Sequence, residues 1–198
     1  AGDDYLAVRV PRDGGTVEGD AGAAANARFT IDDFGSAERL RRNGSAAIVG
    51  SALRLTDAID GQAGSAFFER PLALSASTRL RVRFSFRVVR GVEGLGDGLS
   101  LLLHASPRGP AALGRTGAGL GYQTIAPSLA VELDEHRNTP ADLAGNSASL
   151  VRDGNIAAPL VEVPCGFALA TPAAVFVWID YEGAVMEVRV ADSSLRPA

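Results

Sequence analysis

The sequence contains no lysine, one cysteine, two histidines and no long apolar run. Its 19 basic residues are therefore all arginine, and they are scattered, so the chain lacks the basic stripe that is typical of a nucleic-acid-binding surface. The single cysteine, Cys165, excludes an internal disulfide framework and a cysteine zinc site. The apolar runs are too short to span a bilayer. We therefore expect neither a nucleic-acid partner nor membrane insertion.

What the chain does have is enough apolar residues for a core and many turn residues. Its 198 residues are 46% hydrophobic, and 23 glycines and 10 prolines favour an all-β design. From Phe29 onward, short runs alternate between apolar and polar residues and end at glycine, proline or aspartate. The expected strands cover residues 51–57, 65–74, 78–89, 97–105, 119–125, 128–136, 147–154, 175–181 and 184–192. This pattern predicts an antiparallel β-sandwich over residues 27–198.

The first part of the chain differs in composition from the rest. Residues 1–26 hold one strand-like run, YLAVRV, and then a stretch of small residues, which indicates a linker or a loosely attached first strand. Residues 36–44 are the only segment with some helical character, and they are too few for a stable helix. The chain begins without methionine, which is compatible with removal of a signal peptide.

The stretch SLAVELDEHRNTPADLAGN, residues 128–146, crowds acidic and amide side chains behind an apolar run. The alternation of a strand puts Glu132, Asp134 and His136 on one face, and the next loop can bring Asn138 and Asp142 beside them. Carboxylates this close raise the pKa of one another unless a cation lies between them. Oxygen ligands of this kind suit a hard divalent cation. A solvated acidic loop is the alternative interpretation.

The order Glu-x-Asp-x-x-x-Asn-x-x-x-Asp resembles the metal loop of legume-type (L-type) lectins, which are β-sandwiches of the concanavalin A-like class. Three further pieces resemble the same family and occur in its order: GLGDGLSLLLHAS, TGAGLGYQTI and VFVWIDYEGAVMEVRV. The resemblance covers roughly residues 28–195. It implies a concanavalin A-like jelly roll that binds carbohydrate. The family's last strands would be missing, and the early YLAVRV strand is a candidate to fill the edge that they leave.

The resemblance implies a calcium site. Its ligands would be Asp134, Asn138, Asp142 and the backbone carbonyl of His136. A second, transition metal such as manganese would be held by Glu132, Asp134 and Asp142. We expect that second site not to hold a transition metal tightly, because Ser147 stands where the family has a histidine ligand and ligation by oxygen alone favours calcium.

The resemblance also implies a carbohydrate site. Its contacts would come from Asp97, Asn138, a backbone N–H near Ala118 or Gly119, and His136. Asp97 would accept hydrogen bonds from two sugar hydroxyls, and the amide of Asn138 would bind the same sugar. His136 takes the place where the family stacks an aromatic ring on the sugar. The family's cis peptide bond before the aspartate would be Gly96–Asp97 in this chain.

An enzyme on the same sandwich is a second interpretation, with Glu132 as the nucleophile of a glycoside hydrolase. Retaining hydrolysis needs a second carboxyl group about 5 Å away as the acid/base. The two places for it hold His136 and Arg137, and Glu135 lies on the opposite face of the strand. We therefore expect no catalytic residues. A third interpretation is a lectin-like adhesion or structural module that does not bind sugar.

Together these patterns predict a calcium-dependent carbohydrate-binding domain that recognises glycans without hydrolysing them. We expect it to be bacterial and exported, and to act outside the cell or at the cell surface. It could form a homodimer through sheet packing or belong to a larger surface protein.

Overall fold

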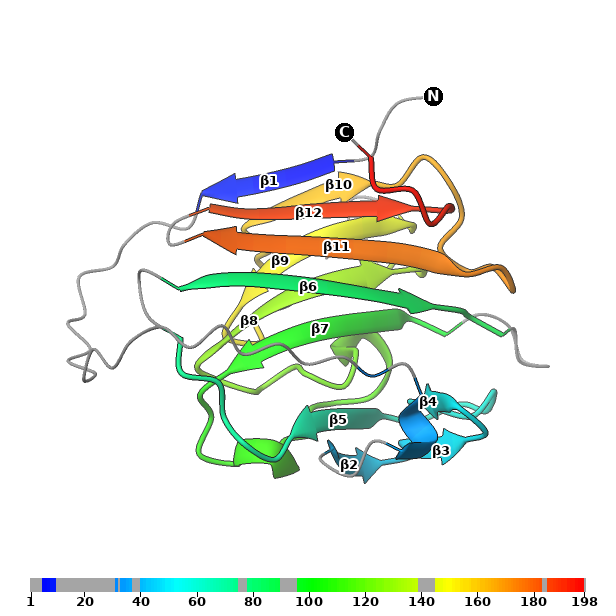
Figure 1. Ribbon diagram of the computed structural model, residues 1–198, viewed down its shortest axis with the longest axis vertical. Coiled ribbons are helices and arrows are strands. Elements are labelled where there is room, and N and C mark those ends of the chain that lie inside the picture. Colours follow the sequence, from blue (N-terminus) through cyan, green and yellow to red (C-terminus); the bar gives the residue numbers. More distant parts are fainter. Residues whose placement is uncertain are drawn as a thin grey trace. The chain divides into compact units, whose positions relative to one another are not determined.

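The computed structural model describes residues 5–9, 31, 33–36, 40–74, 78–89, 96–138, 145–182 and 185–197. The chain divides into two compact units, and both are built of antiparallel strands (Figure 1). The first unit comprises Ala1–Asp32, Pro71–Phe86 and Ala173–Ala198. The second unit comprises Asp33–Arg70 and Arg87–Pro172. No helix in the described part of the chain is long and apolar enough to cross a membrane.

The first unit holds a four-stranded sheet in the order β1-β12-β11-β6. Its strands are β1 (Tyr5–Arg9), β6 (Arg79–Phe86), β11 (Val175–Glu182) and β12 (Val185–Ala191). Alternate residues of β11 and β12 are apolar and buried because the pleat sends them to one face. They are Val175, Val177, Ile179, Met186, Val188 and Val190. The predicted hairpin of β11 and β12 is confirmed, and β1 lies along the edge of β12.

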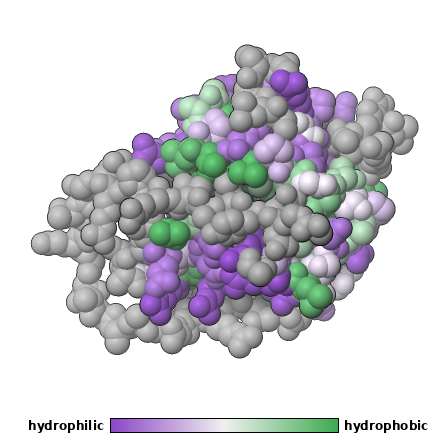
Figure 2. Space-filling model, turned by 90° about the horizontal axis from the view of Figure 1, so that it is seen from above, coloured by the Kyte–Doolittle hydropathy of each residue, from purple (hydrophilic) through white to green (hydrophobic). Residues whose placement is uncertain are grey.

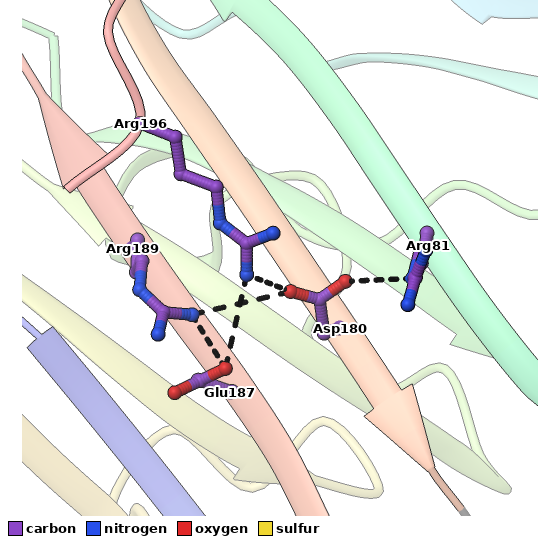
Figure 3. A network of polar contacts seen from close by, with 5 residues as sticks. All are labelled: Arg81, Asp180, Glu187, Arg189 and Arg196. Carbon is purple, nitrogen blue, oxygen red and sulfur yellow. Dashed lines mark hydrogen bonds and ion pairs between the residues drawn. The ribbon is translucent and has the colours of Figure 1, made fainter. Parts of the chain in front are cut away.

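The opposite face of this sheet carries a network of ion pairs around Asp180 (Figure 3). Its carboxylate lies 3.5 Å from Arg81 and 3.9 Å from Arg189, and it also pairs with Arg196. Glu187 lies 2.5 Å from Arg189 and 3.8 Å from Arg196. The network joins three strands and ties the segment after β12 to the sheet through Arg196.

The second unit holds a four-stranded sheet in the order β10-β9-β8-β7. Its strands are β7 (Gly98–His104), β8 (Ser128–Asp134), β9 (Ser147–Arg152) and β10 (Val161–Pro164). Two short ladders accompany it, β2 (Leu40–Gly44) with β5 (Gly64–Phe68) and β3 (Ala47–Val49) with β4 (Ala52–Arg54). The short 3-10 helices are η1 (Phe34–Ser36), η2 (Gly109–Ala111) and η3 (Gly117–Gly119).

A compact apolar cluster lies on one face of β7, β8 and β9 in the second unit. Its buried members are Ala112, Tyr122, Ile125, Ala130 and Val151, and Phe67, Leu102, Leu120 and Ile156 pack against them. Leu102, Ala130 and Val151 are paired across the three strands and therefore project to one face. The cluster fixes the segment between η2 and β8 against the sheet.

Among the residues that the structure describes, the exposed large apolar side chains are scattered over the surface. On the face seen in Figure 2, most of the coloured residues are hydrophilic, with smaller hydrophobic areas between them. The large apolar side chains that are exposed come from different elements: Val49, Ile59, Phe68, Leu74, Val89, Leu160, Val185 and Leu195. Homodimer formation through sheet packing therefore stays a prediction.

Eight of the nine expected strand ranges contain a strand, and one does not. Residues 120–124 form turns after η3, because Leu120 and Thr124 have positive φ angles of 44° and 74°, which no strand adopts. The sequence did not reveal β2, β3 or β10. Strand β2 lies where residues 36–44 showed some helical character, so pairing with β5 outweighs that local tendency.

Candidate functional site

The candidate site lies where four strands of the second unit begin or end. Gly98 of β7, Asp134 of β8, Ser147 of β9 and Pro164 of β10 are paired in register across the sheet. Because neighbouring strands are antiparallel, the segments next to these four residues emerge at one end of the sheet. They are residues 96–97, 135–138, 145–146 and 165–169. We call this the site end of the sheet.

Two buried carboxylates face the same side of the sheet near the site end. Glu132 is paired with Ser100 and Ser149, and Asp134 is paired with Ser147. Residues paired across antiparallel strands share a face, so both acids project with the serines. Glu132 and Asp134 are each only 6% exposed. The alternation expected for β8 is thus confirmed.

The structure brings Asp97 and Asn138 together, although they lie 41 positions apart in the sequence. The Asn138 Nδ2 donates a hydrogen bond of 3.2 Å to Asp97 Oδ1. The backbone N–H of Glu135 donates to the carbonyl oxygen of Asp97 at 2.9 Å. The backbone N–H of His136 donates to Asp134 Oδ1 at 2.8 Å, and the His136 side chain is exposed. The loop after β8 is therefore bonded to both aspartates.

The segment 116–125, which we call the glycine loop, reaches the same place. A Cβ atom on Gly117 would lie 3.8 Å from Asp97 Oδ2. The N–H of Gly119 donates within the loop to the carbonyl of Thr116 at 3.2 Å. This bond makes Ala118 a better candidate than Gly119 to donate a backbone N–H to a ligand.

Tyr122, in the C-terminal half of the glycine loop, donates a hydrogen bond from its hydroxyl to Glu132 Oε1. Its side chain is 1% exposed. Burial and the neighbouring Glu132 charge raise the pKa of Tyr122, so the hydroxyl keeps its proton at neutral pH. Sequence reasoning missed this contact because it assigned residues 119–125 to a strand.

Two further buried polar groups lie beside Asp134. Glu135 is 6% exposed, and neither of its carboxylate oxygens has a hydrogen-bond partner among the described residues. Burial, with a smaller effect of the Asp134 charge, raises the pKa of Glu135 to about 7. The hydroxyl of Ser147 is also buried without a hydrogen-bond partner in the described part of the chain. No sequence signal pointed to Glu135.

Asn146 organises a second loop at the site end. Its Nδ2 donates to the carbonyls of Cys165 and Phe167 at 3.1 and 2.5 Å, and its Oδ1 accepts from the N–H of Leu169 at 2.9 Å. The N–H of Cys165 donates to the carbonyl of Asn146 at 2.9 Å. Sequence reasoning missed this role, since the partners lie about twenty residues away and form no motif.

The oxygen donors suit calcium better than a transition metal. Within the described residues, no group of three or more histidine, cysteine, aspartate or glutamate side chains is placed to hold a metal ion. Asp142, a predicted ligand, lies outside the described residues. Beside Asp134, Glu135 contributes a carboxylate, and Ser147 contributes a buried hydroxyl oxygen at the position where the family has a histidine ligand. Hard cations such as calcium accept such a set, whereas imidazole ligands suit zinc and other transition metals.

One backbone expectation is wrong. The cis peptide bond in the described part of the chain is Ala126–Pro127, and Gly96–Asp97 is not cis. The position of Asp97 is instead set by Gly98. This glycine has a φ of +138°, and its backbone lies in close contact with the backbone of β8. A Cβ atom there would lie 2.2 Å from the carbonyl oxygen of Leu133. Only glycine fits at this position.

We expect Gly98→Ala to displace Asp97 and destabilise the second unit by about 2 kcal/mol or more, through steric overlap and an unfavourable φ. Gly96→Ala is the matched control, because no described atom lies within 4 Å of its added Cβ, and it should change the free energy of unfolding by less than about 0.5 kcal/mol. Denaturant unfolding measures both. Equal stability of the two variants would contradict the close approach of β7 and β8.

Comparisons with known proteins agree with the resemblance found in the sequence. A family model described as the legume lectin domain matches residues 26–197. The L-type lectin-domain containing receptor kinase I.7 of Arabidopsis thaliana is 27% identical in an alignment over 184 residues, and the match covers 82% of this chain. The chain spans only 27% of the length of that receptor kinase.

Solved lectin structures share the fold. The lectin of Bauhinia forficata in complex with GalNAc has a TM-score of 0.66 and 20% identity, over 78% of this chain and 72% of that one. Basic winged bean lectin with Tn-antigen has a TM-score of 0.63 and 20% identity, over 95% and 79% of the two chains. The Ca2+/Man-bound exoplasmic/lumenal domain of VIP36 has a TM-score of 0.60 and 17% identity, over 79% and 66%. The predicted all-β, concanavalin A-like jelly-roll sandwich is confirmed.

Proposed function

Because the chain belongs to the legume lectin domain family, we propose that it is a calcium-dependent carbohydrate-binding domain that recognises glycans without hydrolysing them. The proposed sugar contacts are Asp97, Asn138, a backbone N–H at Ala118 or Gly119, and the exposed ring of His136. The proposed calcium ligands are Asp134, Asn138, Asp142 and the carbonyl of His136.

The observation that carries the proposal is the hydrogen bond between Asn138 and Asp97. The donor Nδ2 and the acceptor Oδ1 lie 3.2 Å apart at the site end, next to the glycine loop. One sugar hydroxyl can take over both roles, since it accepts from an amide and donates to a carboxylate. A hydrogen bond to a charged acceptor is stronger than a neutral one. This pair therefore supports recognition of a hydroxyl-rich ligand.

Calcium would give this pair its orientation. Asn138 and Asp134 lie on one short segment, and the bond from the His136 N–H to Asp134 Oδ1 folds that segment tightly. A cation bound by the oxygen of Asn138 would leave its Nδ2 directed at Asp97 and the sugar. Calcium would supply charge balance for the crowded carboxylates, because removal of like charges from water without a counter-ion is costly.

The position of Glu132 argues against hydrolysis. A nucleophile must reach the sugar, but Glu132 is 6% exposed and accepts a hydrogen bond from Tyr122. His136 and Arg137 occupy the places where a retaining hydrolase would carry its acid/base. The hydrolase and a module without sugar binding remain the competing proposals.

A glycan panel tests the proposed function. Wild-type protein with calcium should bind one class of glycan with a dissociation constant near the millimolar range, about −4 kcal/mol, because a shallow site makes few direct hydrogen bonds. It should release no reducing ends from any glycan on prolonged incubation. Release that Glu132→Gln abolishes would favour the hydrolase, and absence of binding across a broad panel would favour an adhesion or structural module.

The wider setting of the domain is also a proposal. Its matched relative is a receptor kinase, and VIP36 was solved as an exoplasmic/lumenal domain. These relatives support a location outside the cytoplasm, at the cell surface or secreted. They also support a role as the sugar-recognising part of a larger protein. A bacterial source and a homodimer stay predictions.

A further inference from the structure

We propose that Tyr122 is a positioning residue for the carbohydrate site. Through its hydrogen bond to Glu132, it would fix the glycine loop against β8 and so set the distance between that loop and Asp97. This inference rests on the proposed function, and it gives Glu132 a role as hydrogen-bond acceptor rather than as a ligand of a second metal.

Both residues of the contact are buried. The ring of Tyr122 belongs to the apolar cluster with Ile125, Ala130 and Val151, which fixes where the hydroxyl emerges. Its acceptor, Glu132, projects from β8 beside Ser100 and Ser149. The hydroxyl therefore bridges the apolar part of this sheet face and its acidic part.

The rest of the glycine loop bonds mainly to itself or to the segment just before it. The N–H groups of Tyr122 and Gln123 both donate to the carbonyl of Gly119 at 2.9 Å, and the N–H of Leu120 donates to Gly117 at 2.8 Å. Three side-chain bonds of the described residues join the loop to strands of the sheet. They run from Tyr122 to Glu132, from Ser100 Oγ to the carbonyl of Leu120 at 3.4 Å, and from Ser128 Oγ to the carbonyl of Ile125 at 2.6 Å, where the loop enters β8. The bond from Ser128 holds only the last residue of the loop, three positions away in the sequence. Of the two bonds that hold the loop closer to Gly117, the one to Glu132 is the stronger, because its acceptor is a carboxylate, whereas the bond from Ser100 is long.

Two residues of the glycine loop have strained backbone angles, and the bond from Tyr122 to Glu132 would help to hold the loop in this conformation. Leu120 and Thr124 have φ angles of 44° and 74°, and a β-branched residue rarely adopts such an angle. Strained residues persist where their surroundings hold them. Gly117 of the same loop lies next to Asp97. Greater mobility of the glycine loop would therefore change the surroundings of Asp97, which is a proposed sugar contact.

The test is hydrogen exchange of backbone amides, which needs no sugar. Tyr122→Phe keeps the ring and removes one oxygen. The amides of Leu120, Tyr122 and Gln123 should exchange about tenfold faster or more, as expected for loss of a charge-assisted bond. Tyr181→Phe on β11 is the matched control and should leave these amides unchanged. Exchange of the loop amides within twofold of wild type would overturn the inference.

Comparison of Tyr122→Phe with a double variant separates the effect of the hydrogen bond on the loop from an effect on the stability of the whole domain. If Tyr122→Phe makes all amides of β8 and β9 exchange faster, loss of the tyrosine hydroxyl beside the buried Glu132 charge has destabilised the whole sheet. The double variant Tyr122→Phe/Glu132→Leu then removes that charge as well. An apolar pair can replace a polar one at little cost. In that variant the sheet amides should regain protection and the loop amides should not. Recovery of both would show that packing alone holds the loop and would overturn the inference.

Glycan binding gives the functional readout. Tyr122→Phe should weaken the best ligand of the panel about tenfold and change calcium affinity less than twofold. Glu132→Gln should lose less loop protection than Tyr122→Phe, because the amide oxygen still accepts from the tyrosine although the bond is no longer charge-assisted. Equal losses of calcium and sugar affinity would overturn the positioning role. If wild type binds no glycan at all, the proposed function fails, while the exchange experiment still decides whether Tyr122 holds the loop.

Discussion

Asp97→Ala should abolish glycan binding and leave the fold intact. The carboxylate would accept hydrogen bonds from two sugar hydroxyls, and bonds to a charged acceptor contribute about 1.5–3 kcal/mol each. Their joint loss corresponds to an affinity about 100-fold weaker or more, which puts a millimolar ligand beyond detection. The side chain is only half-buried, and the backbone bond from Glu135 to the carbonyl of residue 97 survives the substitution. The melting temperature should therefore change little.

Two variants sharpen this experiment. Asp60→Ala removes an exposed carboxylate elsewhere in the same unit and should bind glycan like wild type. Asn138→Asp is nearly isosteric, but it places an acceptor 3.2 Å from Asp97 Oδ1 where a donor was and adds a negative charge to the acidic loop. It should lose binding as completely as Asp97→Ala. Undiminished binding by both site variants would exclude this pair from the carbohydrate site.

Removal of calcium should lower the melting temperature by roughly 5–10 °C. A ligand present at about 100 times its dissociation constant adds about 2.7 kcal/mol, and 1 kcal/mol shifts the melting temperature of a domain of this size by about 2–4 °C. Without the cation, the carboxylates of Asp134 and Asp142 would repel each other and release the loop between them.

The measurement compares one metal-loaded sample in excess chelator with the same sample in chelator saturated with calcium. Elemental analysis of that sample should find calcium and little manganese or zinc, because Ser147 offers no nitrogen ligand. An unchanged melting curve would contradict a calcium-organised loop. Stoichiometric manganese would show that the second site is occupied despite Ser147.

The strands that carry the site follow from the sequence because their alternation is strong. In β8, Glu132 and Asp134 alternate with buried apolar residues, and the pleat alone predicts that the two acids share a face. The meeting of Asp97 with Asn138 does not follow from alternation. It depends on the register of β7 against β8, which pairs Gly98 with Asp134, and only the family resemblance indicated it beforehand.

The supporting contacts could not be predicted from local patterns. Tyr122 lies in a run whose alternation imitates a strand, yet the positive φ of Leu120 turns the chain there. Asn146 precedes a strand with no motif, and its partners become neighbours only because β9 pairs with β10. Strand β10 itself is four residues long and ends in Pro164, which gives little periodicity to read.

The central claim is that calcium enables this domain to bind glycans, and reversible binding by a single sample tests it most directly. Binding of the best panel glycan should be measured on calcium-loaded wild-type protein, after removal of the metal by chelation and dialysis, and after calcium is added back. We predict millimolar-range binding, then none, then full recovery, with no recovery when calcium is added back to a similarly treated Asn138→Asp sample. Equal glycan affinity in the metal-free and calcium-loaded samples would contradict the account.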